Sequence, residues 1–170
     1  MNGTLISLIV TGIILLSVYT DIRWSKIPNY ITLSAMGLGI LLHGIPWFSN
    51  KGAGFAFSGA LVGLCIFIVP FALGGMGGGD VKLFAAIGAW LGFLSVIWVA
   101  LYTALAGGLL ALFFIITKKK TTKFKEIPTD ILFLILTRSR IKNSEIRNVL
   151  PYSVAIAAGW FVYLGIGSLV

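Results

Sequence analysis

The chain has 170 residues, of which 58% are hydrophobic and only 11% are charged, and its mean hydropathy is +1.03. Soluble domains average about 45–50% apolar and about 25% charged residues, so this composition excludes an ordinary soluble domain as well as a disordered chain. A single cysteine, Cys65, excludes a disulfide-stabilised scaffold. Length and composition therefore predict one integral-membrane domain over residues 1–170, whose helices cross the bilayer several times.

The predicted elements are apolar stretches that approach the roughly 20 residues a helix needs to cross a bilayer. We expect an all-α protein with about six transmembrane helices, at residues 4–20, 30–48, 54–73, 81–94, 96–117 and 150–169. The first stretch lacks a basic start and a small-residue cleavage site, so it is not expected to be a signal peptide. Residues 81–117 are too many for one crossing, so we expect a tight turn near 92–95 and a short fourth helix. The apolar run 131–136 is too short to span the bilayer and is expected to lie at its surface.

Basic residues give the expected orientation of these spans. The chain carries 13 lysines and arginines against five aspartates and glutamates, a formal charge of +8. Six crossings place Arg23, Lys26, Lys82 and the basic loop at about 118–148 on one side, and only Lys51 on the other. The positive-inside rule then assigns the loop to the cytosol and both termini to the outside of the cell membrane. Because the basic residues flank apolar spans, we expect them to contact anionic lipids rather than nucleic acid.

Two residue types within the spans have structural interpretations. Glycines four residues apart, Gly59 with Gly63 and Gly88 with Gly92, let membrane helices approach closely, so we expect them to serve helix packing. The tryptophans mostly fall near the ends of predicted spans and are expected to be interfacial anchors: Trp24, Trp47, Trp90, Trp98 and Trp160.

Two aspartates lie at the predicted cytosolic boundary, where Asp21 closes the first span and Asp80 opens the fourth. Ionisable residues at the edge of a span are functional candidates, and two carboxyls that share a site do not both ionise readily. One then acts as a general acid and the other as a general base, which is what amide hydrolysis requires without metal, serine or cysteine. The competing interpretation is that each carboxyl caps a helix end or pairs with the basic residue two positions further on, Arg23 or Lys82.

A glycine-rich run precedes Asp80, since five of the six residues at 74–79 are glycine. Such a run breaks a helix, and a membrane protein accepts irregular backbone only where protein buries it or a water-filled cavity borders it. Glycines also let another backbone come close, as a substrate in extended form requires. A nucleotide-binding loop is excluded, because Asp80 stands where a Walker loop needs lysine and where a dinucleotide fingerprint needs glycine.

The sequence G-G-G-D at residues 77–80 matches the G-x-G-D signature of the type IV prepilin peptidases, a family of membrane aspartyl proteases. The continuation at 80–88, the segment from Asp21 to Ile-Pro-Asn at 27–29, and the segment at 150–159 resemble that family in the same order. The resemblance covers nearly the whole chain, and the ordered set of elements is more specific than G-x-G-D alone.

This resemblance implies an endopeptidase that removes the short N-terminal leader from type IV pilin-like precursors at the cytosolic face of the membrane. It assigns Asp21 and Asp80 as the catalytic pair. It also implies two signature glycines and two residues that shape the site: Gly77, Gly79, Lys82 and Asn29. Large bifunctional members carry paired C-x-x-C elements and also methylate the new N-terminus. With one cysteine, this chain resembles the minimal peptidase-only branch of the tight-adherence (Flp) pilus type, and zinc binding and methyl transfer are not expected.

Other interpretations stay open at this point. Asp21 and Asp80 are also compatible with a small proton-coupled transporter or channel, with an archaeal-type preflagellin peptidase, or with a non-catalytic subunit. No cofactor or metal is expected, because the only histidine, His43, has no cysteine or second histidine nearby and is interpreted as structural. Asp130, in the basic loop, is a weaker candidate for a third active-site carboxyl. The sequence leaves open the oligomeric state and which aspartate acts as the base.

Overall fold

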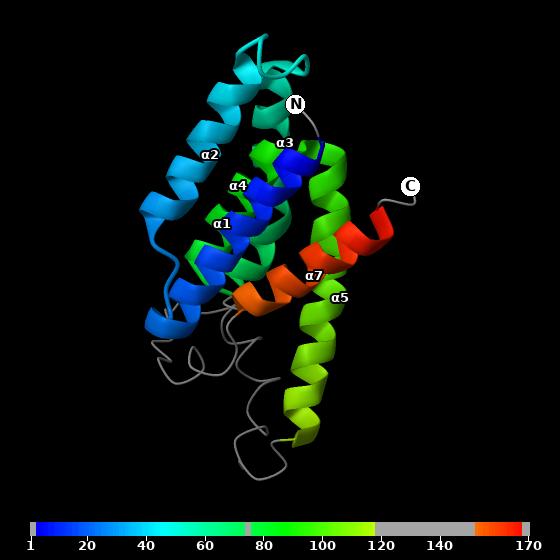
Figure 1. The fold of residues 1–170 in the computed structure, drawn as a ribbon. Coiled ribbons are helices and arrows are strands. Elements are labelled where there is room, and N and C mark those ends of the chain that lie inside the picture. Colours follow the sequence, from blue (N-terminus) through cyan, green and yellow to red (C-terminus); the bar gives the residue numbers. More distant parts are fainter. Residues whose placement is uncertain (1–2, 74–75, 118–151, 168–170) are drawn as a thin grey trace.

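The computed structural model describes residues 3–73, 76–117 and 152–167, and within these residues it contains helices and turns but no strand. The helices are drawn in Figure 1 and are, in chain order, α1 (Gly3–Trp24), α2 (Asn29–Gly44), α3 (Gly52–Ala72), α4 (Gly78–Leu91), α5 (Phe93–Thr117) and α7 (Tyr152–Ile166). The predicted all-α fold is confirmed, and each predicted apolar stretch corresponds to one of these helices. The predicted surface turn at 131–136 lies outside the described residues.

The described helices differ in length. α1 and α3 have 22 and 21 residues, and together with Phe93–Leu110 of α5 they are long and apolar enough to cross a membrane. α2, α4 and α7 have 16, 14 and 15 residues. The short fourth helix agrees with the prediction. The second and last helices are shorter than predicted, because they do not extend over the whole of their apolar stretches. The chain is therefore an α-helical membrane protein in which long spans alternate with shorter apolar helices.

Glycine ends α4 where the sequence predicts a turn. Gly92 has a φ of +79°, and its N–H donates a 2.8 Å hydrogen bond to the carbonyl of Gly88. Side chains rarely adopt this left-handed conformation, whereas glycine adopts it readily. α5 begins at the next residue, so the predicted division of residues 81–117 is confirmed.

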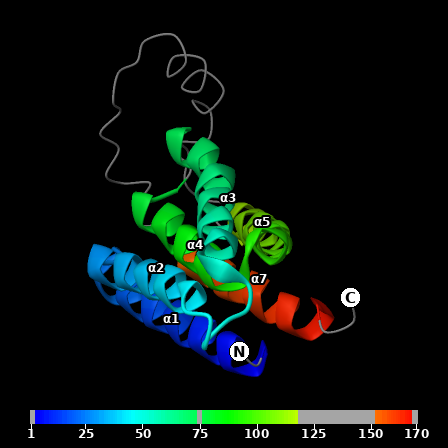
Figure 2. The same ribbon diagram turned by 90° about the horizontal axis from the view of Figure 1, so that it is seen from above.

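α4 is the central helix of the bundle, and it packs against α1, α2, α3 and α5. Figure 2 shows it between α2 and α3. A Cβ on Gly59 of α3 would collide with the backbone carbonyl of Gly88, and a Cβ on Gly88 would collide with that of Gly59. A Cβ on Gly63 would meet the backbone of Phe84. The glycine pairs thus bring two helix backbones into contact, which confirms the packing role predicted from their spacing.

Two tryptophans are core residues, so their assignment as interfacial anchors is wrong. Trp90 is 2% exposed and donates a 2.8 Å hydrogen bond to the carbonyl of Ala35 in α2. Trp160 is fully buried and donates a 2.9 Å hydrogen bond to Thr11 Oγ1 in α1. Each indole buries its ring while its N–H finds an acceptor on a neighbouring helix, which ties α4 to α2 and α7 to α1. The other tryptophans are exposed, as an anchor requires: Trp24, Trp47 and Trp98.

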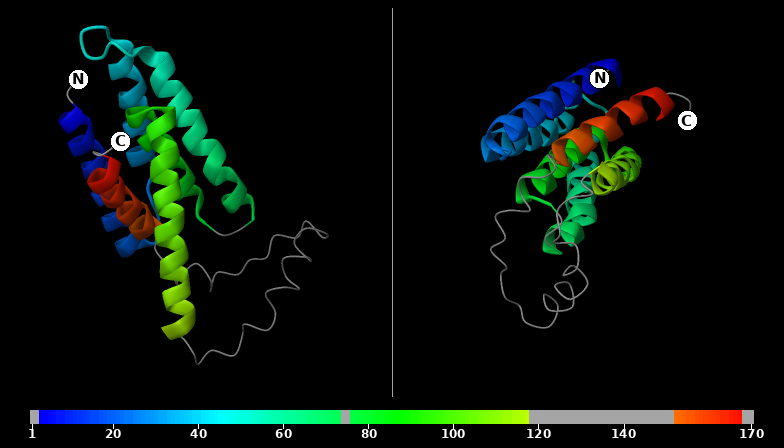
Figure 3. Two further views of the ribbon diagram at one scale, coloured as in Figure 1. Left: turned by 90° about the vertical axis from the view of Figure 1, so that its right-hand side faces the viewer. Right: turned by 90° about the horizontal axis from the view of Figure 1, so that it is seen from below.

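The helices create two distinct ends of the bundle (Figure 3). The aspartate end holds the last turn of α1, with Asp21, and the first turns of α4 and α7, with Asp80 and Tyr152. The histidine end holds the start of α1 and the end of α2, with His43, together with the turn at 45–51 that leads into α3. These two ends contain the polar features that matter for function.

Candidate active site

Asp21 lies in the last turn of α1 and is partly buried. Its Oδ2 accepts a 2.6 Å hydrogen bond from the hydroxyl of Ser153, the second residue of α7. Ser153 is fully buried, so this bond forms inside the contact between α1 and α7. The carbonyl end of a helix disfavours an anion, whereas the N-terminal end of α7 and its hydroxyl favour one. The packing of α7 on α1 therefore supplies Asp21 with the stabilisation that its own helix does not.

Asp80 lies in the first turn of α4 and is 7% exposed. Its Oδ2 accepts a 3.1 Å hydrogen bond from the N–H of Gly77, and its own N–H donates to the carbonyl of Gly77 at 3.1 Å. This is a capping arrangement at a helix N-terminus, a position that stabilises negative charge. The interpretation that Asp80 caps a helix is thus confirmed, and the cap also fixes the carboxyl at the start of α4.

The helix segments that carry the two aspartates meet at the aspartate end of the bundle. α1 packs against both α4 and α7, and Ser153 at the start of α7 donates its hydrogen bond to Asp21. Two residues far apart in the sequence are thereby gathered at the aspartate end.

The glycines before Asp80 fit closely against their surroundings. A Cβ on Gly77 would lie 3.2 Å from Asp80 Oδ2, in the space that the capping carboxyl occupies. A Cβ on Gly79 would lie 3.0 Å from the Cβ of Ile27 and 3.4 Å from its carbonyl oxygen. Ile27 is buried in the turn between α1 and α2. Gly79 thus allows the turn before α4 to pack against the segment that follows Asp21, and Gly77 leaves room for the capping carboxyl.

The two residues expected to shape the site contact each other. Lys82 Nζ, on the exposed side of α4, donates a 2.9 Å hydrogen bond to Asn29 Oδ1 at the start of α2. This bond lies next to the contact of Gly79 with Ile27, so both predicted segments, 27–29 and 77–82, meet along one seam. Asn29 therefore positions the side chain of Lys82. The sequence alone does not predict this contact.

Ser153 is not among the site residues that the sequence predicts. The segment at 150–159 was noted only for its resemblance, because one serine in an apolar stretch has no pattern that identifies a partner in α1. Asp130 lies outside the described residues. Within 3–73, 76–117 and 152–167, no three His, Cys, Asp or Glu side chains gather into a group that could hold a metal ion.

Together these features define a class of protein: a helical membrane protein with two aspartates at one end of its bundle, one of them directly after a glycine-rich turn. The sequence model of the type IV leader peptidase family matches residues 8–112, and the chain belongs to this family. The resemblance identified in the sequence is therefore confirmed.

The chain is also similar to individual members of that family. It is 31% identical over 117 residues to a prepilin leader peptidase/N-methyltransferase of Aeromonas hydrophila, and the match covers 65% of this chain and 40% of that protein. A protein of the same name from Legionella pneumophila is 31% identical over 116 residues, with the same coverage of each chain. The chain thus spans about two fifths of the length of these relatives. No solved structure matches it significantly.

Proposed function

We propose that this chain is a membrane aspartyl endopeptidase that removes the short N-terminal leader from type IV pilin-like precursors. Membership of the leader peptidase family supports this reaction. The observation that supports the assignment of Asp21 and Asp80 is the close contact between Ile27, which follows Asp21, and Gly79, which precedes Asp80, where α1 packs against α4. Two carboxyls held at one place can divide the roles of base and acid.

The proposed reaction is hydrolysis of one peptide bond with water as the nucleophile. The ionised carboxyl takes a proton from water as the water oxygen attacks the carbonyl carbon. The protonated carboxyl donates a hydrogen bond to the carbonyl oxygen and then gives its proton to the leaving nitrogen as the C–N bond breaks. We assign the two roles to the pair rather than to either aspartate alone.

The neighbouring residues would position this pair and the substrate. Ser153 holds one oxygen of Asp21, and Gly77 holds one oxygen of Asp80. The glycine-rich turn offers a backbone without side chains against which an extended segment of the precursor can lie. Lys82 and Asn29 would form one border of that surface.

We further propose that the aspartate end faces the cytosol. Arg23, Lys26 and Lys82 belong to this end, and the basic loop at about 118–148 joins helices α5 and α7, whereas the histidine end carries Lys51. The positive-inside rule then places both termini outside, and the loop near anionic lipids of the inner leaflet.

The test is coexpression of the chain with a pilin-like precursor in cells that lack a leader peptidase, with mass spectrometry of the precursor N-terminus. Asp21→Asn and Asp80→Asn should each lower leader removal by roughly 10²–10⁴-fold, the usual contribution of a general acid or base. Glu145→Gln is the matched control, because it replaces a carboxylate by an amide at an acidic residue to which no catalytic role is assigned. Near-normal cleavage by either active-site variant would refute the pair, and normal cleavage by both would favour the non-catalytic interpretation.

A further inference from the structure

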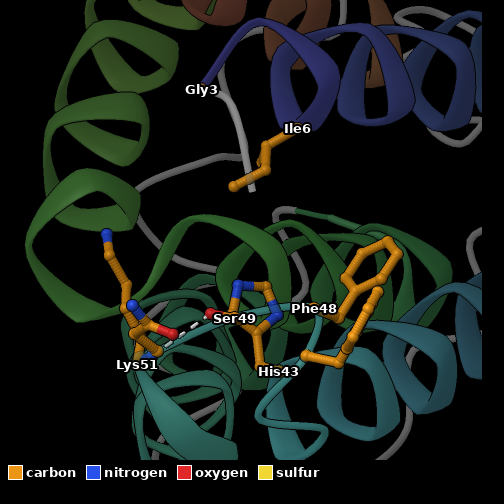
Figure 4. A pocket seen from close by; sticks show the side chains of 8 residues that line it. Gly3, Ile6, His43, Phe48, Ser49 and Lys51 are labelled. Atoms are coloured by element: carbon orange, nitrogen blue, oxygen red, sulfur yellow. Dashed lines mark hydrogen bonds between the residues drawn. The ribbon is translucent and has the colours of Figure 1, made fainter.

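A cavity of about 340 Å³ opens at the histidine end of the bundle, away from the two aspartates. It lies between the first turn of α1, with Gly3 and Ile6, and the turn that joins α2 to α3, with Ser49 and Lys51. Figure 4 shows the ring of His43 pointing into the space below Ile6, with Lys51 at one side. The cavity is polar along the turn and apolar on the side of α1.

His43 presents an unpaired hydrogen-bond acceptor in this cavity. The side chain is 1% exposed, and its Nδ1 lies 2.8 Å from the carbonyl oxygen of Gly39. Because a carbonyl only accepts, Nδ1 carries the hydrogen, and Nε2 of the neutral ring keeps its lone pair. Nε2 is buried and has no hydrogen-bond partner among the described residues. Buried polar atoms in native proteins are nearly always paired, so an occupant with a donor is expected here.

Lys51 adds a positive charge to the same cavity. Its Nζ lies 4.4 Å from the centre of the Phe55 ring, and that ring lies 5.5 Å from the ring of His43. None of the residues that line the cavity is acidic. An occupant with an anionic group for Lys51 and a hydrogen-bond donor for His43 would therefore complement the residues that line this cavity.

The position of the cavity relative to the membrane narrows the choice of occupant. Trp47, which also lines it, is 96% exposed, and such tryptophans lie at the level of the lipid head groups. The head group of phosphatidylglycerol combines a phosphodiester anion with hydroxyl donors. We propose that this cavity binds the head group of a phospholipid of the phosphatidylglycerol class, with its phosphate at Lys51 and a hydroxyl donating to Nε2 of His43.

The test compares the purified chain in nanodiscs of phosphatidylcholine, which offers no donor, with nanodiscs that also contain phosphatidylglycerol. Phosphatidylglycerol should raise the thermal midpoint of the wild type by several degrees, and native mass spectrometry should detect a retained phosphatidylglycerol molecule. His43→Phe keeps a ring between Phe55 and Trp90 but removes the acceptor. It should lower phosphatidylglycerol retention at least fivefold and abolish most of the thermal shift.

Two further variants keep the test decisive. Lys51→Gln changes an exposed side chain that the fold does not need, and it should also lower retention at least fivefold. Lys26→Gln, an equally exposed lysine at the aspartate end, should leave retention within twofold. If phosphatidylglycerol raised the thermal midpoint equally in all variants, the proposal would be overturned. A water molecule would then be the partner of His43 Nε2. If glycerol phosphate added to phosphatidylcholine nanodiscs gave the full thermal shift, a soluble ligand would replace the lipid and the proposal would also fail.

Discussion

The two ends of the helix bundle differ in how their buried polar groups are satisfied. At the aspartate end, Asp21 and Asp80 accept hydrogen bonds from Ser153 and Gly77. At the histidine end, Nε2 of His43 has no partner among the described residues, although the imidazole is almost fully buried. The first end uses the protein's own groups to fix carboxyls before a substrate arrives, whereas the second depends on something from outside the chain. Substitutions at the aspartate end should therefore change catalysis, and those at the histidine end should change the response to lipid.

The largest expected effect concerns the two carboxyls as a unit. The double variant Asp21→Asn/Asp80→Asn should cleave at the rate of the slower single variant, within about threefold. The reason is that the losses of rate caused by substituting groups that act together are strongly non-additive. Initial rates of leader removal in membranes, normalised to the amount of inserted protein, provide the measurement. A double variant whose loss equals the product of the two single losses would mean that the aspartates act independently.

Loss of the Ser153 hydroxyl should have the next largest effect. A hydrogen bond to a charged group contributes about 1.5–3 kcal/mol, so Ser153→Ala should lower kcat roughly tenfold or more while KM changes little. Ser17→Ala is the matched control, since Ser17 is also fully buried but its hydroxyl donates to the carbonyl of Ile13 in its own helix. Equal losses in both variants would point to a general packing defect rather than to orientation of Asp21.

Gly79→Ala should have an intermediate effect. The new Cβ would lie 3.0 Å from the Cβ of Ile27, and overpacking of this kind costs about 1 kcal/mol or more, so cleavage should fall about fivefold. Gly78→Ala places its Cβ 3.4 Å from the Phe71 ring, an ordinary contact, and should stay within twofold of the wild type. Rates and thermal midpoints measured together separate misalignment of the site from loss of folded protein. If Gly78→Ala and Gly79→Ala lowered cleavage by the same factor, the contact between residues 27–29 and 77–79 would not be what aligns the site.

The smallest effect should come from the exposed bond between Lys82 and Asn29. A solvent-exposed hydrogen bond contributes about 0.5 kcal/mol, so Lys82→Gln and Asn29→Ala should each change cleavage about twofold. In a double-mutant cycle their effects should be less than additive, since each removes the same bond. Strict additivity would show that the two residues act separately at this border of the site.

Much of the fold could be predicted because the bilayer imposes simple rules on the sequence. The apolar stretches identify the helices, and the glycine at 92 marks the turn between α4 and α5 because few other residues adopt its conformation. Small residues at 59, 63 and 88 indicate close helix contact. Burial could not be predicted in the same way. Trp90 and Trp160 stand near span ends, as anchors do, and only the packing of α2 and α1 on their rings makes them core residues.

The candidate site was predictable only where a motif carries it. Asp21, Asp80 and the glycines at 77 and 79 stand in recognisable segments. The role of Ser153 depends on the contact between α1 and α7, which a single sequence does not encode as a pattern. His43 has no ligand-type neighbours in the sequence and was interpreted as structural. Only the structure shows that the turn at 45–51 covers the His43 ring and that Nε2 has no hydrogen-bond partner among the described residues.

The shortness of α4 bears on where cleavage would take place. Its 14 residues rise about 21 Å, whereas the hydrocarbon layer of a bilayer is about 30 Å thick. Such a helix is too short to reach both surfaces of the bilayer, and Asp80 stands in its first turn. Hydrolysis would then occur at a depth set by the length of one helix. A precursor anchored by its apolar segment would need to rise only partway toward the water to be cut.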